Sequence, residues 1–333
     1  MKFLSQQEKQ ALVFLTTAAL ASIVVSIYFG VNTHQKSENV VSKKIYIIHA
    51  CGDIEKNFKE NYNTKNVKYD IHSYQPQMNS SDISPDDWNV IASDVFQKYN
   101  KYSAFVIVCG SDTMDYTASA LSFMLENLSK PIIITDGNVK SAVKLAAKTK
   151  IPEVMIEFEG KLLRGCRTIR KSVEYFTSPS YPYLEEHNCL EQPSENIEIK
   201  FINPNINILV VKVFPGISDT LFNFSDDDMV SGIILEIYES GNAPKSKKFI
   251  NAIKKLIKKG VVIIAVSQSE KVLKFELDNN LLEAGVIPGN DMTTPAAYAK
   301  LYFLLSNVKN INLIHQLMEK IFRGEMTVNY PSI

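Results

Sequence analysis

The sequence contains little glycine, proline or cysteine, and it has no excess of charge of either sign. Its 333 residues include 13 Gly, 13 Pro and 4 Cys, and 36 basic side chains balance 36 acidic ones. This composition excludes collagen-like, disordered and disulfide-scaffold proteins. A net charge of zero, without a basic run that contains aromatic residues, argues against a nucleic-acid partner. The length suits about two domains.

The few cysteines lie too far apart in the sequence for a CxxC redox motif or a zinc knuckle. They are Cys51, Cys109, Cys166 and Cys189. Cys51 and Cys109 each end a predicted strand, and His49 lies close to Cys51, so a metal site or a disulfide is the alternative to two buried thiols. In strands, buried thiols are commoner than metal-binding or disulfide-bonded cysteines. We therefore expect no metal and no cofactor.

The longest uncharged run lies near the N-terminus. Ala11–Gly30 has no charged residue, and at about 1.5 Å per residue it covers the roughly 30 Å hydrocarbon core of a bilayer. A cleavable signal peptide is the alternative, but its apolar region is usually shorter. Residues 1–43 are therefore predicted to be a single-pass membrane anchor with a polar tether. Lysines flank both ends of the run, so the positive-inside rule selects no orientation.

The rest of the chain alternates short apolar runs with helical patterns. The runs are Ile45–Ala50, Ala104–Cys109, Pro131–Thr135, Glu153–Phe158, Ile208–Phe214, Gly232–Ile237 and Val261–Val266. Continuous Ile- and Val-rich runs are typical of strands covered on both faces. Helical patterns follow Ser84 and cover Thr117–Leu128, Thr294–Ser306 and Ile311–Phe322. This alternation predicts an α/β fold with parallel sheets.

A polar stretch with two prolines divides this α/β region into two parts. We expect a larger N-terminal domain at residues 44–190 with a mostly parallel sheet. A linker at residues 191–207 would connect it to a smaller C-terminal domain at residues 208–333, which has its own parallel sheet.

Two predicted strand ends combine a glycine with small polar residues. Cys51-Gly52-Asp53-Ile54 follows the first strand, and Cys109-Gly110-Ser111-Asp112-Thr113-Met114 follows the next. In open α/β sheets, ligands bind beyond the carboxyl ends of strands. The structural alternative is that these residues only end a strand and cap a helix. Neither stretch is a dinucleotide-binding or Walker motif.

Several long segments resemble bacterial-type L-asparaginases. GSDTMDYTASALSFMLENLSKPIIIT, starting at Gly110, resembles the segment that begins GTDTM in that family, and LLEAGVIPGNDMTTPAAYAKLYFLL, starting at Leu281, resembles its C-terminal domain. NSSDISPDDW, FPGI and SGNAP match further family motifs between Asn79 and Pro244. The resemblance implies two α/β domains, hydrolysis of asparagine to aspartate and ammonia, and a homodimer or homotetramer.

The resemblance also assigns catalytic positions, where this chain departs from the family. The family uses one threonine in GGTI and a second in GTDT, with the adjacent aspartate and a lysine for proton transfer. Here Asp53 stands at the first threonine, Ser111 at the second, Asp112 is retained, and Arg170 stands at the lysine. A guanidinium cannot lose its proton near neutral pH. Lys171 is one residue out of register, and we expect it to point elsewhere.

The binding positions implied by the resemblance are better retained. Ser80 and Ser81 match the segment that holds the α-carboxylate of the amino acid, Asp112 could pair with its ammonium group, and Gly110 lets the backbone approach it. Asn242 and Glu276 match positions that approach the site of a neighbouring subunit.

The lid loop that the family carries between the first threonine and the binding serines is missing, because fewer residues separate Asp53 from Ser80 than in the family. A site without its lid admits water and orients substrate loosely. We therefore expect a membrane-anchored, asparaginase-like protein with impaired catalysis that keeps a pocket for asparagine or aspartate. The alternative is an active asparaginase or glutaminase that uses Ser111 and Asp112, or a water activated by Asp53.

Overall fold

The computed structural model describes most of the chain after residue 42. The described residues are 43–52, 54, 67–172, 175–178, 183–190, 192–194, 196–224, 230–269 and 275–327, and they belong to one compact unit, Lys43–Ile333. The predicted anchor at Ala11–Gly30 and the candidate residue Asp53 lie outside them. Among the described residues, no helix has both the length and the apolar character needed to cross a bilayer.

The first sheet has six strands in the order β2-β1-β3-β5-β6-β7. Their bounds are β1 Lys43–His49, β2 Val67–Ser73, β3 Ala104–Val108, β5 Ile132–Thr135, β6 Val154–Phe158 and β7 Lys161–Arg164. All neighbours pair in parallel except β7, which runs antiparallel to β6. The central strands β3 and β5 are buried along their whole length, as their continuous apolar sequences require.

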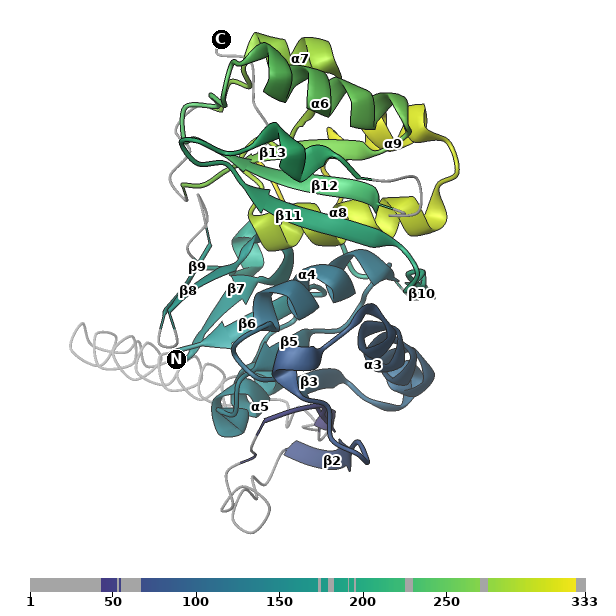
Figure 1. The fold of residues 1–333 in the computed structure, drawn as a ribbon. Helices are drawn as coiled ribbons and strands as arrows, with labels where there is room; N and C mark the ends of the chain where they lie inside the picture. Colours follow the sequence, from purple (N-terminus) through teal and green to yellow (C-terminus); the bar gives the residue numbers. More distant parts are fainter. Residues whose placement is uncertain are drawn as a thin grey trace, which may run out of the picture. The chain divides into compact units, whose positions relative to one another are not determined.

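Helices cover both faces of this sheet (Figure 1). Helix α3 is Pro85–Lys98, α4 is Met114–Met124 and α5 is Val139–Lys148. Helix α3 begins with a capping box between Ser84 and Asp87 and has proline at its first position, which explains why it starts there. Helices α3 and α4 pack on one face, and α5 packs on the other.

The second sheet has four parallel strands in the order β11-β12-β13-β14. Its elements are β11 Asn207–Lys212, β12 Val230–Ile237, β13 Val262–Ser267, β14 Ile287–Pro288, α6 Lys247–Lys258, α7 Asn279–Ala284, α8 Thr294–Asn307 and α9 Ile311–Met318. Helices α6 and α7 cover one face, and α8 covers the other and shares a core with α4. The Phe123 and Phe303 rings lie 6.3 Å apart between these two helices.

The remaining elements are short. They are β4 Leu125–Glu126, β8 Ile169–Ser172, β9 Tyr175–Thr177, β10 Glu198–Ile199, and the 3₁₀ helices η1 Ser80–Asp82, η2 Tyr99–Lys101, η3 Gly165–Arg167, η4 Glu186–Asn188 and η5 Asp219–Phe222. The predicted α/β fold with a larger N-terminal and a smaller C-terminal sheet is confirmed. The helices expected to reach Leu128 and Phe322 end earlier, at Met124 and Met318.

Candidate active site

The two predicted strand ends and a serine meet at one edge of the first sheet. Strands β1 and β3 are neighbours, with His49 paired to Val108, so the loops that follow them emerge side by side. Gly52 has a φ of +79° and lies beside Gly110. A Cβ on Gly110 would lie 2.5 Å from both Cβ and Oγ of Ser80. Only glycine allows this approach, because any side chain at position 110 would collide with the serine.

The segment that carries Ser80 and Ser81 is held in place by short polar contacts. It forms η1, directly after the loop that follows β2. The Thr113 hydroxyl donates to the Ser80 carbonyl at 2.8 Å, and the Ser81 N–H donates to Asn79 Oδ1 at 3.2 Å. Ser80 is half-buried and Ser81 is exposed. Ser80 therefore lies against the Gly110 loop, in which the half-buried Ser111 is the next residue.

Asp112 and Arg170 form an ion pair, with Arg170 Nη1 2.5 Å from Asp112 Oδ1. Arg170 lies on β8, and its backbone N–H donates to Asp115 Oδ2 at 2.9 Å. Asp115 is buried in the first turn of α4, and this burial raises its pKa. The Asp115 carboxylate therefore fixes the strand that presents the guanidinium. The Asp112 side chain remains 57% exposed and the Arg170 side chain 19% exposed, so the pair lies at the surface of the site.

A cavity of about 430 Å³ lies next to this ion pair. Its lining residues are Asp112, Asp115, Tyr116, Ile169, Arg170, Lys171, Ser172, Glu236, Thr294 and Pro295. The expectation that Lys171 points elsewhere differs from the structure, since Lys171 and Arg170 line the same cavity. Glu236 and Thr294 come from the C-terminal domain, and the Thr294 hydroxyl donates to Glu236 Oε1 at 2.6 Å. Neither residue was predicted from the sequence, although Glu236 lies near the carboxyl end of β12, where ligands of such sheets bind.

Asn242 and Glu276 lie close together in the C-terminal domain. A Cβ on Gly241 would lie 1.9 Å from the Glu276 carbonyl oxygen, and the Asn242 amide donates to Ser240 Oγ at 2.7 Å. Both residues are exposed. Neither is among the described residues that line the cavity beside Arg170, so within one chain the structure does not bring them to that site.

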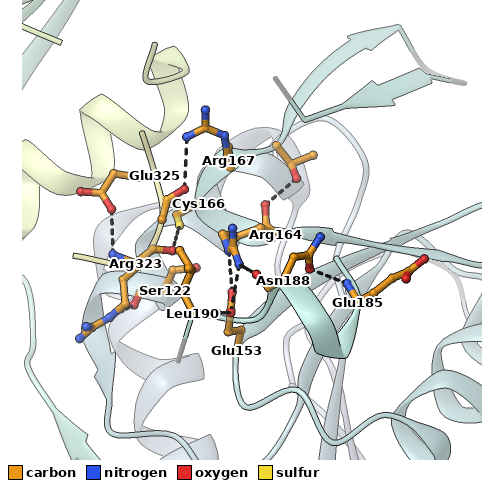
Figure 2. A network of polar contacts seen from close by, with 12 residues as sticks. Ser122, Glu153, Arg164, Cys166, Arg167, Glu185, Asn188, Leu190, Arg323 and Glu325 are labelled. Carbon is orange, nitrogen blue, oxygen red and sulfur yellow. Dashed lines mark hydrogen bonds and ion pairs between the residues drawn. The ribbon is translucent and has the colours of Figure 1, made fainter. Parts of the chain in front are cut away.

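A buried polar network holds the segment that leads into β8 (Figure 2). Arg164 pairs with Glu153 at 2.7 Å, and both side chains are 4% exposed. The Cys166 thiol donates to the carbonyl of Arg323 at 3.2 Å. Arg167 is fully buried and forms an ion pair with Asp291 at 2.5 Å. The contacts of Cys166 and Arg167 join η3 to the C-terminal domain, three residues before Arg170, and so set the position of β8 at the cavity.

Known proteins match this chain over nearly all of its α/β region. The family model "Asparaginase, N-terminal" matches residues 32–198, and the model "Glutaminase/Asparaginase C-terminal domain" matches residues 207–318. L-asparaginase 1 of Escherichia coli K12 is 39% identical over 288 residues, which span 78% of this chain and 85% of that protein. L-asparaginase of Dirofilaria immitis is 34% identical over 306 residues, or 80% of this chain and 50% of that protein.

Among solved structures, L-asparaginase I from Vibrio cholerae superposes with a TM-score of 0.77 at 34% identity. That match covers 86% of this chain and 99% of the other. The L-asparaginase from Thermococcus kodakarensis, at 23% identity and a TM-score of 0.74, shares the fold. With both family domains matched in order and a relative 39% identical, this chain belongs to the asparaginase family of amidohydrolases.

Proposed function

We propose that this protein hydrolyses the side-chain amide of asparagine, releasing aspartate and ammonia. The proposal rests on the cavity lined by the Asp112–Arg170 ion pair. Ser111 directly precedes Asp112 in the sequence. The 39% identity with L-asparaginase 1 of Escherichia coli supports the same reaction. This is the active alternative of our sequence analysis, and the comparisons favour it over the expectation of impaired catalysis.

In the proposed reaction, the Ser111 hydroxyl attacks the carbonyl carbon of the amide. Arg170 binds one oxygen of the Asp112 carboxylate, and the second oxygen is the group we assign to accept the serine proton. The guanidinium keeps its own proton, so its contribution is the positive charge that stabilises the negative charge on the carbonyl oxygen. Collapse of the tetrahedral intermediate expels ammonia, and water then releases aspartate from the acyl-serine.

The test is ammonia and aspartate release from asparagine by the full-length protein in detergent. We expect turnover by the wild type and a loss of at least a hundredfold in Ser111→Ala. Ser93→Ala, a half-buried serine on α3 whose hydroxyl accepts from Gln97, is the matched control and should keep full activity. Activity that persists in Ser111→Ala but disappears in Asp53→Asn would instead assign the attack to a water activated by Asp53.

Binding without turnover is the second candidate function. It is favoured by Arg170, which stands at the position of the lysine in the family and cannot serve as a base. A calorimetric titration with aspartate separates the two candidates, with Asp112→Ala as the control that removes the contact to the ammonium group. Binding that depends on Asp112, together with no ammonia above background, would establish the second candidate and refute the first.

We also propose that Ala11–Gly30 anchors the protein to a membrane. The support is the length of its uncharged run, and the N-terminal family model begins only at residue 32. The full chain should stay with the membrane fraction after carbonate extraction. Leu20→Arg combined with Val24→Arg should release it, whereas Lys9→Arg, outside the run, should not. Release of the wild type by carbonate would contradict the proposal.

The homodimer or homotetramer implied by the family is a further proposal. Its support is that Asn242 and Glu276 are exposed and lie outside the lining of the cavity in their own chain. Light scattering of the detergent-solubilised protein measures the assembly. A monomer with full activity would contradict a role for these two residues in the site of a neighbour.

A further inference from the structure

Two thiols lie in contact beneath the candidate site. Cys51 follows β1 and Cys109 follows β3, and each directly precedes the glycine of one site loop. Their sulfur atoms are 3.2 Å apart, and both side chains are fully buried. Neither thiol has a role in the proposed hydrolysis.

The backbone explains why the thiols meet. The N–H groups of Ala50 and Cys51 both donate to the carbonyl of Val108, at 3.0 and 3.2 Å. Because two successive N–H groups share one acceptor, the chain after β1 gains one residue relative to the chain after β3. This extra residue places Cys51 beside Cys109. Neighbouring strands lie about 4.8 Å apart, and a disulfide spans Cα separations of about 4.4–6.8 Å. The strand ends are therefore spaced for a covalent bond.

The two sulfur atoms are not equivalent. The two thiols share a hydrogen bond, and Cys51 Sγ also accepts the Gly110 N–H at 3.0 Å. The hydrogen bond with Cys109 and the Gly110 N–H lower the pKa of the Cys51 thiol, whereas the hydrogen bond with Cys51 and burial raise the pKa of Cys109. Cys51 is therefore the nucleophile of the pair and Cys109 the resolving thiol.

We propose that Cys51 and Cys109 form a reversible redox pair that closes to a disulfide when the protein meets a peroxide. The Cys51 sulfur attacks one peroxide oxygen, the O–O bond breaks, and one water leaves with a sulfenic acid on Cys51. The Cys109 sulfur then attacks the Cys51 sulfur, the S–O bond breaks, and a second water leaves. The two thiols lose two electrons and the peroxide gains them. A dithiol reductant reverses the reaction by exchange.

Closure must move the walls of the site. The sulfur atoms have to approach from 3.2 Å to about 2.05 Å, and a disulfide sulfur accepts the Gly110 N–H poorly. A Cβ on Gly110 would collide with Ser80, so the loop has little free space on that side. The oxidised protein should therefore bind aspartate at least tenfold more weakly. This consequence rests on the proposed function, whereas formation of the disulfide does not.

The test uses the full-length protein, hydrogen peroxide and a readout that needs no substrate. After denaturation and alkylation, mass spectrometry should find Cys51 and Cys109 joined in one peptide pair that is about 2 Da lighter than the two thiols. Cys166 is the internal control, because it is equally buried but donates to a carbonyl and not to a second thiol. It should remain alkylated. Oxidation of Cys166 at the same rate, without the cross-link, would overturn the proposal.

The single tryptophan gives a second readout in the folded protein. The Trp88 N–H donates to Thr117 Oγ1 at 3.1 Å, and Cys109 Sγ lies 4.0 Å from the same oxygen. Oxidation should change Trp88 fluorescence, and dithiothreitol should restore it. Cys51→Ser and Cys109→Ser should each abolish the change, so the test survives if one of them fails to fold. A disulfide that leaves aspartate affinity unchanged would refute the effect on the site but not the pair itself.

Discussion

Replacing Arg170 by lysine tests whether the lack of a base at position 170 limits the proposed catalysis. The guanidinium lies 2.5 Å from Asp112 and supplies charge but no base. At pH 8.5, a lysine with an ordinary pKa of about 10.4 is roughly 1% neutral, whereas an arginine stays protonated. The variant therefore presents a neutral base that the wild type lacks. Neutral arginine would be the stronger base, which offsets part of the advantage of lysine. We therefore expect Arg170→Lys to gain about tenfold to a hundredfold in kcat.

The stability of the protein should hardly change in this variant. Asp112 is more than half exposed, and surface ion pairs of this kind contribute about 1 kcal/mol or less. The backbone N–H of residue 170 keeps its bond to Asp115 whatever the side chain. Thermal unfolding should therefore give the same Tm within a few degrees, so a change in rate cannot come from partial unfolding.

The assay is ammonia release from asparagine between pH 7 and 10. The rate of Arg170→Lys should rise with pH as the amine loses its proton, and the wild-type profile should stay flatter. Arg170→Gln removes the charge without adding a base, so it is the matched control. Equal rates for the lysine and glutamine variants, with unchanged Tm, would refute the reasoning and show that position 170 does not limit proton transfer.

Three further variants test the fold around the site. Glu325→Gln leaves Lys300 without its carboxylate where both side chains are fully buried, so the free energy of unfolding in urea should fall by about 3–5 kcal/mol; a loss below about 1 kcal/mol would contradict this. Gly110→Ala places a Cβ 2.5 Å from Ser80 and should weaken aspartate binding in calorimetry, and unchanged affinity would show that Ser80 moves aside freely. Burial raises the pKa of Tyr102 to about 12 from about 10 in the unfolded chain, so its contribution to stability is complete below pH 10 and is lost as the pH rises toward 12. Tyr102→Phe should make denaturant-measured stability fall less steeply there, by up to about 1.4 kcal/mol per pH unit.

The strands of the two sheets were predictable where both of their faces are buried. Continuous apolar sequence identified β1, β3, β5 and β13, because most of their side chains are buried. Strand β2 was not predicted, because it lies at the edge of its sheet and alternates between half-buried and exposed side chains. From the sequence alone, its polar residues are as typical of a loop as of an edge strand.

Only those parts of the site that a local sequence pattern marks were predictable. The rule that ligands bind at carboxyl ends of strands identified the loops at Gly52 and Gly110, and the structure brings them together. Glu236 and Thr294 come from another domain, and no local pattern joins them to Arg170. Lys171 was expected to point away because side chains alternate along a strand. The pairing of β8 with β9 shifts register at this point, and such an irregularity breaks the alternation.

The parts of the site that would hold an amino acid are distinct from those that would cleave it. The Gly110 loop fits against Ser80 through backbone and hydroxyl contacts that do not involve Arg170, so a change at position 170 leaves that contact intact. The thiols Cys51 and Cys109 adjoin both site loops but take no part in the proposed hydrolysis. Binding should therefore respond to the redox state and turnover to residue 170. A variant that combined Arg170→Lys with oxidation should lose affinity for aspartate while keeping its steeper pH profile, because the two changes act on different atoms.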